Sequence, residues 1–407
     1  MGKFVLFLIT LIILMVALLL GGLFFDKASQ IPTIKDGWFG RGKKKPVDES
    51  VVPFTVNITD DVLKDLQTRL ENVRLSEDLE NVKFQYGFQV KYMKEVLDYW
   101  KNNYSWRESE EILNQFSHFK TNIEGIDVHF IHVKPKRSTG KATRALLLTH
   151  GWPGSVFEFY KLLPMLTDPI SHGGSEEDAF EVICPSIPGY GFSEAAHQPG
   201  MNTLAVGRIF VKLMARLGHE SFYLQGGDWG AIISIIIAQA YPDVEGGLES
   251  SEYLVLYTKA NPFALNDSPV GLAAYIMEKF GAWTNLELHL NSIDGAITEK
   301  FTLDELLTNV MIYWTTGSIG SSVRLYKESL AGHEEVEAWE SVQVTVPTSL
   351  AAFPNDIYLV PRAIAEVRFK NIVQYSMMPR GGHFAALEEP RLLADDLIAF
   401  VKIVENK

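Results

Sequence analysis

A turn of small residues at positions 226–230, Gly-Gly-Asp-Trp-Gly, constrains the fold of this chain more than any other stretch. An apolar, strand-like run at residues 221–224 precedes it, and an isoleucine-rich run at 231–240 follows it with the composition of a buried helix. Glycines two residues before and after Asp228 give the spacing of a nucleophile elbow, a sharp strand-to-helix turn in which only small flanking residues avoid collision. The pattern therefore predicts Asp228 on this turn, at a helix start whose backbone N–H groups favour an anion.

A carboxylate at the centre of such a turn indicates a particular chemistry. Serine in this position forms an acyl-enzyme, whereas an aspartate that attacks carbon forms an alkyl ester. We therefore predict Asp228 as a catalytic nucleophile. A tight turn with a surface aspartate that caps a helix fits the same five residues, so the rest of the chain has to decide between the two interpretations.

The runs around the elbow predict a layered fold. A continuous apolar run at 145–149 suits a strand that is buried on both faces, and further strands are expected at 180–184, 347–353 and 372–377, with a helix at 206–217. Strands that alternate with helices indicate a mainly parallel sheet with right-handed crossovers. Alternation at 126–133 predicts an antiparallel strand, with His129 and His132 on its more polar face.

The loop after the strand at 145–149 reads His-Gly-Trp-Pro-Gly-Ser, at residues 150–155. A loop of this kind, upstream of a nucleophile elbow, supplies one backbone N–H group of an oxyanion hole, and the residue after the nucleophile supplies the other. We therefore expect the N–H groups of Trp152 and Trp229 to hold the oxyanion.

Hydrolysis of an alkyl ester needs a base that activates water, and His383 is placed to be that base. It lies in a glycine-rich turn, between the predicted strand at 372–377 and a helix that begins near residue 384. The strand at 347–353 leads to Asp356, which has the place of the orienting acid in the chain order nucleophile, acid, histidine. We predict Asp356 as the acid, with Glu366 as the second choice.

Composition excludes one class of partner and one kind of cross-link. The 407 residues carry a formal net charge of −13, whereas a protein that binds nucleic acid needs a basic face. The single cysteine, Cys184, excludes an internal disulfide, and no Cys/His cluster has the spacing of a zinc site. We expect neither a metal ion nor an organic cofactor for the reaction.

The amino-terminal segment has the sequence of a membrane anchor. Residues 4–25 contain no charged side chain, and at about 1.5 Å per helical residue they can cross a hydrocarbon core of about 30 Å. Only Lys3 precedes this run, whereas several lysines and arginines follow it. The positive-inside rule therefore predicts a single-pass protein whose body lies in the cytosol, and a cleaved signal peptide is the other interpretation.

Three motifs behind this segment carry a family resemblance. They are His-Gly-Trp-Pro-Gly-Ser at 150–155, Pro-Gly-Tyr-Gly-Phe-Ser at 188–193 and Gly-Gly-Asp-Trp-Gly at 226–230. In this order they resemble the microsomal epoxide hydrolase family, which includes the insect juvenile hormone epoxide hydrolases. The resemblance runs from about residue 50 to the carboxyl terminus, and His383 lies in a segment similar to the family's histidine motif. It implies an α/β-hydrolase fold with an inserted helical lid, and hydrolysis of lipophilic epoxides to diols at the endoplasmic reticulum membrane.

The resemblance also implies two lid tyrosines whose hydroxyl groups donate to the epoxide oxygen. Residues 321–328, Ser-Ser-Val-Arg-Leu-Tyr-Lys-Glu, match one of the family's motifs and select Tyr326. Tyr253 lies nearest the place expected for its partner, and Tyr257 and Tyr275 are the alternatives.

The chain departs from the family after Pro242. The family has a further core strand and lid helices there, but in this chain residues 243–250 lead almost directly to Tyr253, so that the segment is a few dozen residues short. Loss of a central strand would expose backbone hydrogen-bonding groups. We expect either a replacement strand at 253–257 or an impaired sheet, and an impaired sheet would favour a non-catalytic relative of the fold.

These patterns predict six parts: an anchor at 1–25, a linker at 26–49, an amino-terminal segment at 50–125, the first part of the hydrolase core at 126–248, a shortened lid at 249–345 and the second part of the core at 346–407. The predicted function is that of a membrane-anchored epoxide hydrolase whose partners are a lipophilic epoxide and water. A haloalkane dehalogenase is the nearest rival, because it also uses an elbow aspartate but has no need of lid tyrosines.

Overall fold

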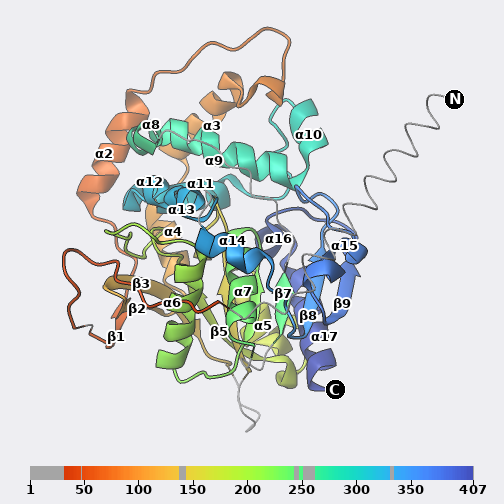
Figure 1. Ribbon diagram of the computed structural model, residues 1–407. Helices are drawn as coiled ribbons and strands as arrows, with labels where there is room; N and C mark the ends of the chain where they lie inside the picture. The colour runs from red at the N-terminus through yellow and green to blue at the C-terminus, as the bar shows by residue number, and fades with distance from the viewer. Residues whose placement is uncertain are drawn as a thin grey trace, which may run out of the picture.

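One mixed β-sheet forms the centre of the molecule (Figure 1). The computed structural model describes residues 32–46, 48–136, 144–242, 247–250, 262–330 and 334–406. In spatial order the described strands are β1 (Val51–Phe54), β2 (His118–Ile123), β3 (Ile126–Val133), β5 (Phe180–Pro185), β4 (Arg144–Thr149), β6 (Tyr223–Gly226), β7 (Leu248–Ser250), β8 (Thr348–Ala352) and β9 (Ile372–Met377).

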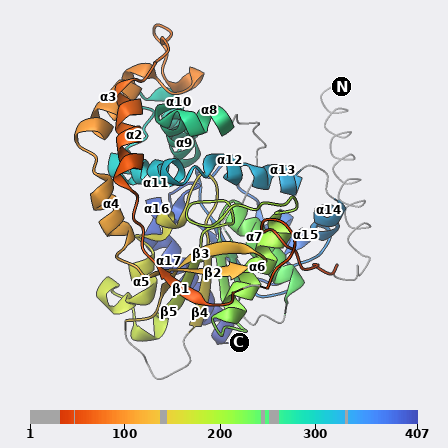
Figure 2. The same cartoon turned by 90° about the vertical axis from the view of Figure 1, so that its left-hand side faces the viewer.

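The sheet is parallel from β5 to β9, as the alternation of strands and helices predicted. Helices cover both of its faces (Figure 2): α6 (Thr203–Arg216) and α7 (Trp229–Ala240) pack on one, and α5 (Leu163–Thr167) and α17 (Pro390–Glu405) on the other. Because the central strand β4 is enclosed in this way, its leucines at 146–148 are fully buried, which explains the continuous apolar run.

The antiparallel end of the sheet corrects one expectation about histidines. β3 pairs antiparallel with β2 and with β5, as predicted. His129 and His132, however, do not share a face, because residues three apart on a strand point to opposite sides. His129 is fully buried and hydrogen-bonded to the side chains of His118 at 2.8 Å and Ser186 at 2.9 Å, whereas His132 lies on the opposite side and contacts Glu181. The shared polar face was therefore wrong.

The sheet is continuous at the point where the sequence departs from the family. β7 consists of three residues, pairs parallel with both β6 and β8, and so fills the gap between them. The expectation of an impaired sheet was therefore wrong, because residues 248–250 supply the strand. The alternative replacement strand at 253–257 lies outside the described residues. Gly247 permits β7 to start here, since a Cβ atom on it would lie 2.0 Å from the Phe400 ring of α17.

A second group of helices lies above the carboxyl ends of the parallel strands, and we call it the upper helical layer (Figure 1). Its members are α8 (Pro262–Asp267), α9 (Pro269–Thr284), α10 (Leu286–Asn291), α11 (Leu303–Thr316), α12 (Ile319–Ser322) and α13 (Arg324–Leu330). The remaining described α-helices of the second half are α14 (Glu334–Glu340), α15 (Arg362–Arg368) and α16 (Ala385–Glu388).

The helices of the amino-terminal segment pack on this upper layer (Figure 1). They are α2 (Asp60–Glu71), α3 (Val90–Asn102) and α4 (Trp106–Leu113). Arg69 of α2 forms an ion pair with Asp267 at 2.9 Å, and the Tyr99 hydroxyl of α3 donates to Asp304 at 3.0 Å. Segments about 200 residues apart in the chain are thus joined side by side.

The predicted anchor at residues 1–25 lies outside the described residues. Among the helices that the structure describes, from residue 32 onward, none has both the length and the apolar character needed to cross a bilayer.

Candidate active site

Asp228 occupies the turn between β6 and α7 with a backbone φ of +53°, a conformation that is strained for any residue but glycine. A Cβ atom on Gly226 would lie 2.4 Å from the carbonyl carbon of Gly230, and one on Gly230 would lie 1.9 Å from the carbonyl oxygen of Thr149. Packing therefore requires both glycines of the motif. The turn directs the carboxylate of Asp228 away from the end of β6 into a buried site, where the residue is 5% exposed.

The loop after β4 contacts one oxygen of this carboxylate. The Trp152 backbone N–H donates to Oδ1 of Asp228 at 2.8 Å. The loop can come this close because residue 151 is glycine: a Cβ atom there would lie 2.4 Å from Cβ of Asp228. Trp229, the second expected donor, is the first residue of α7, where backbone N–H groups have no partner within the helix.

His383 lies against the other oxygen. Its Nε2 is 3.4 Å from Oδ2 of Asp228, and its Nδ1 donates to Oδ1 of Asp356 at 2.7 Å. The side chains of His383 and Asp356 are each 3% exposed, so water does not compete for this contact. The structure thus brings together three residues that are up to 155 positions apart in the sequence, since Asp228 lies in the first part of the core and His383 in the second.

Two loops are joined in a way that places Asp356 beside His383. The Asn355 N–H donates to the Gly381 carbonyl oxygen at 3.0 Å, which links the loop after β8 to the loop after β9. The Ile357 N–H donates to Oδ1 of Asp356 at 2.7 Å and helps to orient the carboxylate. Glu366, the second choice for the acid, lies on α15, where it is 52% exposed and paired with Arg362. The structure does not bring it to His383.

The upper helical layer holds the loop that carries His383. The His383 backbone N–H donates to the carbonyl oxygen of Trp283, near the end of α9, at 3.0 Å. A Cβ atom on Gly382 would lie 2.7 Å from that same oxygen, so this glycine is needed for the approach. The Trp283 ring also packs edge-on against the imidazole, with 4.9 Å between ring centroids. Movement of α9 would therefore displace the histidine.

The charge state of His383 depends on its neighbours. Burial lowers the pKa of His383, but the carboxylates of Asp356 and Asp228 outweigh burial and raise the pKa to about 10. Each carboxylate favours the imidazolium form by its negative charge. Neutralisation of the Asp228 carboxylate would remove one of these charges and so lower the pKa of His383.

Aromatic side chains pack around Trp152 and Trp229, the two residues expected to hold the oxyanion. Tyr326 is 4% exposed, and its ring packs edge-on against Trp229 at 4.7 Å and Trp152 at 5.7 Å. Burial raises the pKa of the Tyr326 phenol well above its ordinary value, and the nearby Asp228 adds to the effect, so the hydroxyl stays protonated and can donate. Tyr275 joins this aromatic group, with its ring centroid 5.6 Å from that of Trp152. Tyr253 and Tyr257 lie outside the described residues.

One further carboxyl group lies in this site, and sequence reasoning missed it. Glu158, in the 3-10 helix η2 (Val156–Phe159), packs against the loop after β4: a Cβ atom on Gly154 would lie 2.4 Å from its Oε2. Burial raises the pKa of Glu158 to about 8, with a smaller lowering effect from His383 and a raising effect from Asp228. The sequence does contain a sign of this buried carboxyl group, because Glu158 is a single charged residue in an apolar run just after the His-Gly-Trp-Pro motif.

The described residues around Asp228 contain no set of three side chains arranged to hold a metal ion. The one such set in the described part of the chain, His132 with Glu181 and His219, lies elsewhere. The groups that the described residues bring to Asp228 are an imidazole paired with a second carboxylate, backbone N–H groups and the Tyr326 phenol.

Comparison with known proteins identifies relatives of this arrangement. Residues 51–159 match the family "Epoxide hydrolase N terminus", and residues 144–246 match "alpha/beta hydrolase fold". "Epoxide hydrolase 1" of Oryctolagus cuniculus is 46% identical over 437 aligned residues, which cover 94% of this chain and 95% of that protein. "Juvenile hormone epoxide hydrolase 2" of Ctenocephalides felis is 39% identical, with 94% of this chain and 93% of that protein covered.

Comparison with solved structures gives the same family. The crystal structure of juvenile hormone epoxide hydrolase from the silkworm Bombyx mori superimposes with a TM-score of 0.84 at 38% identity, covering 91% of this chain and 98% of that one. The alignment with the Oryctolagus cuniculus protein is longer, at 437 positions, than the 407 residues of this chain. That relative therefore contains residues that have no counterpart here.

Proposed function

This chain belongs to the epoxide hydrolase family, whose fold is that of the α/β-hydrolases, and we propose that it opens lipophilic epoxides to diols through an ester on Asp228. The single observation that carries this proposal is the unequal environment of the two Asp228 oxygens. Oδ1 accepts the Trp152 N–H, whereas Oδ2 faces His383.

In the first step, Oδ2 of Asp228 attacks an epoxide carbon, and the bond between that carbon and the epoxide oxygen breaks. The oxygen receives a proton from a tyrosine hydroxyl, for which Tyr326 is our first choice because it lies buried against Trp229. A second tyrosine shares this task. Tyr253 is the candidate from the sequence, and the position of Tyr275 beside Trp152 keeps it as the alternative.

In the second step, His383 removes a proton from water, and the water oxygen attacks the carbonyl carbon of the ester. Negative charge then develops on Oδ1, where the N–H groups of Trp152 and Trp229 stabilise it. Asp356 holds the imidazolium by its hydrogen bond to Nδ1. The bond from the carbonyl carbon to Oδ2 breaks, and the His383 imidazolium gives its proton to Oδ2, so the diol leaves with Oδ2. The acid formed on Asp228 keeps the oxygen of water and returns its proton to the tyrosinate, which restores the starting state.

Glu158 fits this scheme as a positioning residue. Because its pKa is raised to about 8, its carboxyl group is mostly protonated at pH 7 and offers both a donor and an acceptor near His383. We propose that it orients the attacking water. It has no covalent part in the reaction, so its loss would slow the second step more than the first.

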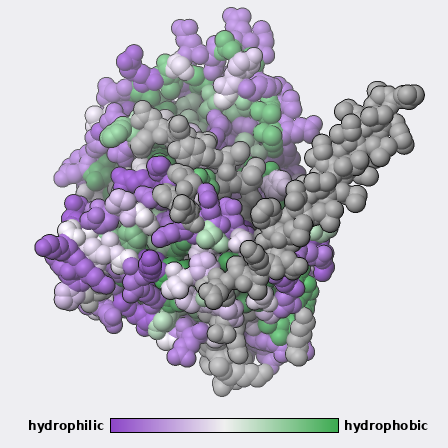
Figure 3. All heavy atoms as spheres, in the orientation of Figure 1, coloured by the Kyte–Doolittle hydropathy of each residue, from purple (hydrophilic) through white to green (hydrophobic). Residues whose placement is uncertain are grey.

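We further propose that residues 4–25 anchor the protein in the endoplasmic reticulum membrane as a single span, with the catalytic body in the cytosol and the upper helical layer as the lid. The uncharged sequence of that segment supports the anchor. Exposed apolar side chains on the upper helical layer, such as Phe263 on α8 and Leu286 on α10, also fit a substrate that partitions into lipid. Figure 3 shows hydrophobic residues exposed among hydrophilic ones on this face of the molecule. Carbonate extraction of membranes that contain the full chain, compared with a variant lacking residues 1–25, tests the anchor.

The decisive experiment on the reaction is a single turnover of styrene oxide or cis-stilbene oxide, with enzyme in excess, in oxygen-18 water. The mechanism requires unlabelled diol and one labelled oxygen in the peptide that contains Asp228. Label in the diol would mean that water attacks the epoxide directly. Asp228→Ala should abolish diol formation, and a folded wild type without activity on either substrate would favour a non-catalytic relative.

A haloalkane dehalogenase remains the second candidate, and one observation favours it. Both indole Nε1 atoms of Trp152 and Trp229 are buried, and that of Trp152 has no hydrogen-bond partner among the described residues, so the pair could receive a halide ion. Release of chloride or bromide from a haloalkane, at a rate comparable to diol formation from an epoxide, would support this reaction. Comparison of the Tyr326→Phe variant on the two substrates separates the functions, since halide release needs no phenol donor.

A further inference from the structure

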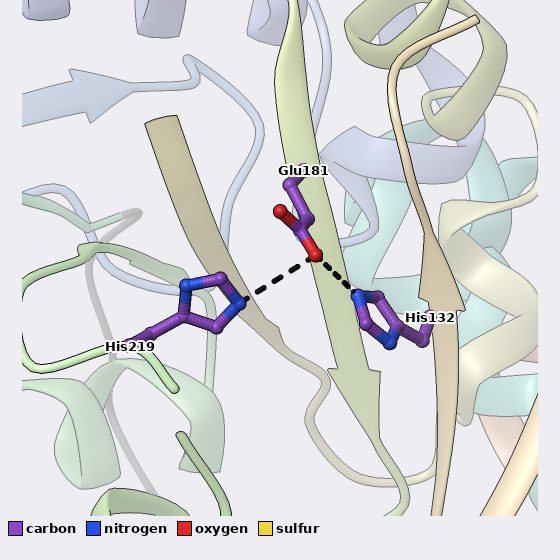
Figure 4. Close-up of side chains that lie close together, drawn as sticks. All are labelled: His132, Glu181 and His219. Atoms are coloured by element: carbon purple, nitrogen blue, oxygen red, sulfur yellow. Dashed lines mark hydrogen bonds and ion pairs between the residues drawn. The ribbon is translucent and has the colours of Figure 1, made fainter. Parts of the chain in front are cut away.

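Three polar side chains meet at the end of the sheet opposite to the end that carries Asp228 (Figure 4). Glu181 is the second residue of β5, His132 is near the end of the antiparallel neighbour β3, and His219 precedes β6. Because β5 and β6 run in the same direction, Glu181 and His219 lie near the amino ends of these strands. Asp228 follows the carboxyl end of β6, and the trio is therefore separated from the catalytic site by the length of the sheet.

The two imidazoles converge on one carboxylate oxygen of Glu181. Oε1 of Glu181 lies 2.7 Å from Nε2 of His132 and 3.6 Å from Nε2 of His219, and all three atoms are within 4.8 Å of one another (Figure 4). A zinc ion with ligand bonds of about 2.0–2.1 Å in tetrahedral geometry needs its ligand atoms roughly 3.3–3.4 Å apart. The 2.7 Å pair would have to move apart, and a pair at the 4.8 Å limit would have to approach by about 1.4 Å, which small side-chain rotations can supply.

The backbone holds His219 in this position. α6 ends in a Schellman motif, in which the Gly218 N–H donates to the carbonyl oxygen of Ala215 at 3.0 Å and the His219 N–H donates to that of Met214 at 2.9 Å. Gly218 has a φ of +88°, the left-handed conformation that this motif requires. The end of α6, which depends on Gly218, thus directs the His219 imidazole toward Glu181.

The state of His219 suits a metal ligand. Its side chain is 16% exposed, and its buried Nε2 has no hydrogen-bond partner within the part of the chain that the structure describes, since the nearest oxygen of Glu181 is 3.6 Å away. A hydrogen-bonded pair of His132 and Glu181 alone does not explain why a second imidazole presents an unpartnered nitrogen to the same oxygen.

We propose that His132, Glu181 and His219 bind one divalent transition-metal ion, with Zn²⁺ as the best fit. Two imidazoles and one carboxylate are ligands that Zn²⁺ accepts, and they leave a fourth position for water. The ion would tie β3 and β5 to the turn between α6 and β6, which would stabilise the fold and would have no part in the reaction. Lys134 opposes it, because its ammonium group lies 3.9 Å from Oε1 of Glu181, but this side chain is 74% exposed and free to turn into solvent.

The test is zinc titration of the full chain, purified in detergent without a histidine tag and stripped with a chelator, followed by calorimetry. We expect one equivalent of Zn²⁺, and at least roughly tenfold weaker binding in His219→Ala and in Glu181→Gln, since each loses one of three ligands. Lys134→Met should bind more tightly. His197→Ala is the matched control, because His197 forms a comparable pair with Glu194 at 2.7 Å, and its affinity should equal that of the wild type.

Two further measurements distinguish the site from non-specific binding and from misfolding. Copper bound in place of zinc should show coupling to two imidazole nitrogens by electron paramagnetic resonance, and to one in His219→Ala. Diol formation by the variants should stay within about twofold of the wild type, which would show that they fold. Absence of stoichiometric zinc binding in the wild type, or equal affinity in His219→Ala, would overturn the proposal.

Discussion

The Trp152 backbone N–H lies 2.8 Å from Oδ1 of Asp228 and so gives the two oxygens of one carboxylate different environments. Oδ1 is held where an oxyanion can form, and Oδ2 is left facing His383 at 3.4 Å. Glycine at 151 makes this contact possible, because a side chain there would collide with Asp228. The fold itself thus gives the two oxygens their different contacts, and the proposed mechanism assigns each oxygen a different part.

His383→Gln should separate the two steps of the reaction. Attack by Asp228 does not need the base, whereas ester hydrolysis does, so we expect turnover to fall by about 10²–10⁴-fold while the ester accumulates. Intact-protein mass spectrometry after mixing with styrene oxide should show a mass increase of one substrate molecule. The Asp228→Ala variant is the control, and an unmodified His383→Gln protein would contradict the order of the two steps.

Tyr326→Phe should slow the first step and spare the second. Loss of one donor to a developing alkoxide costs about 10²-fold or more in rate, and a second tyrosine limits the damage. Rapid-mixing measurements of ester formation and ester decay separate the two effects. Tyr160→Phe is a suitable control, because that hydroxyl donates to the Leu113 carbonyl oxygen, away from Asp228. Equal rates of ester formation in Tyr326→Phe and the wild type would remove Tyr326 from the mechanism.

The second tyrosine can be identified in the same way. If Tyr253 is the partner, Tyr253→Phe should reduce the rate of ester formation about as much as Tyr326→Phe does, and Tyr275→Phe should have little effect. The reverse pattern would assign the role to Tyr275, whose ring lies beside Trp152. The double variant with Tyr326→Phe should then be close to inactive on epoxides.

Glu158→Gln should change stability in a way that depends on pH. The folded protein holds the pKa of Glu158 at about 8, above the value of about 4.3 for an exposed glutamate, so the folded state binds a proton that the unfolded state has released. The stabilising contribution of that proton is complete below about pH 4 and is lost as pH rises to 8.

Glutamine does not titrate, so the melting temperature of Glu158→Gln should rise relative to the wild type between pH 5 and 8 and then keep a constant difference. A pH-independent difference would contradict the raised pKa. Ester decay in this variant, measured in single turnover at pH 7, reports separately on the orientation of water, which a purely structural role would leave unchanged.

Gly247→Ala should destabilise the fold at the shortened segment. Its Cβ atom would lie 2.0 Å from the Phe400 ring, and such overpacking typically costs about 1–3 kcal/mol. Gly207→Ala is the control, because the nearest atoms are 3.4 Å from the new Cβ and the residue lies within α6, where alanine is favoured. Urea denaturation of the two variants should show opposite shifts of the midpoint.

Sequence patterns were informative where a local signal was long. The strand at 372–377 and the strand-to-helix turn at Asp228 lie where hydrophobic period and glycine spacing placed them. β7 could not be predicted, because three residues are too few to show a period, and its place depends on the open edges of β6 and β8. Glu158 and His219 were missed for a related reason: their roles come from burial and from neighbours distant in the chain.

The contact between Arg69 and Asp267 has a consequence for synthesis on the ribosome. These residues are 198 positions apart, and at about 5–20 residues per second the second one emerges roughly 10–40 seconds after the first. During this interval the helices of the amino-terminal segment have no upper helical layer to pack against, so part of their apolar surface stays exposed to solvent. Chaperone binding during translation should concentrate in this interval, and a shorter segment between the two shortens the wait.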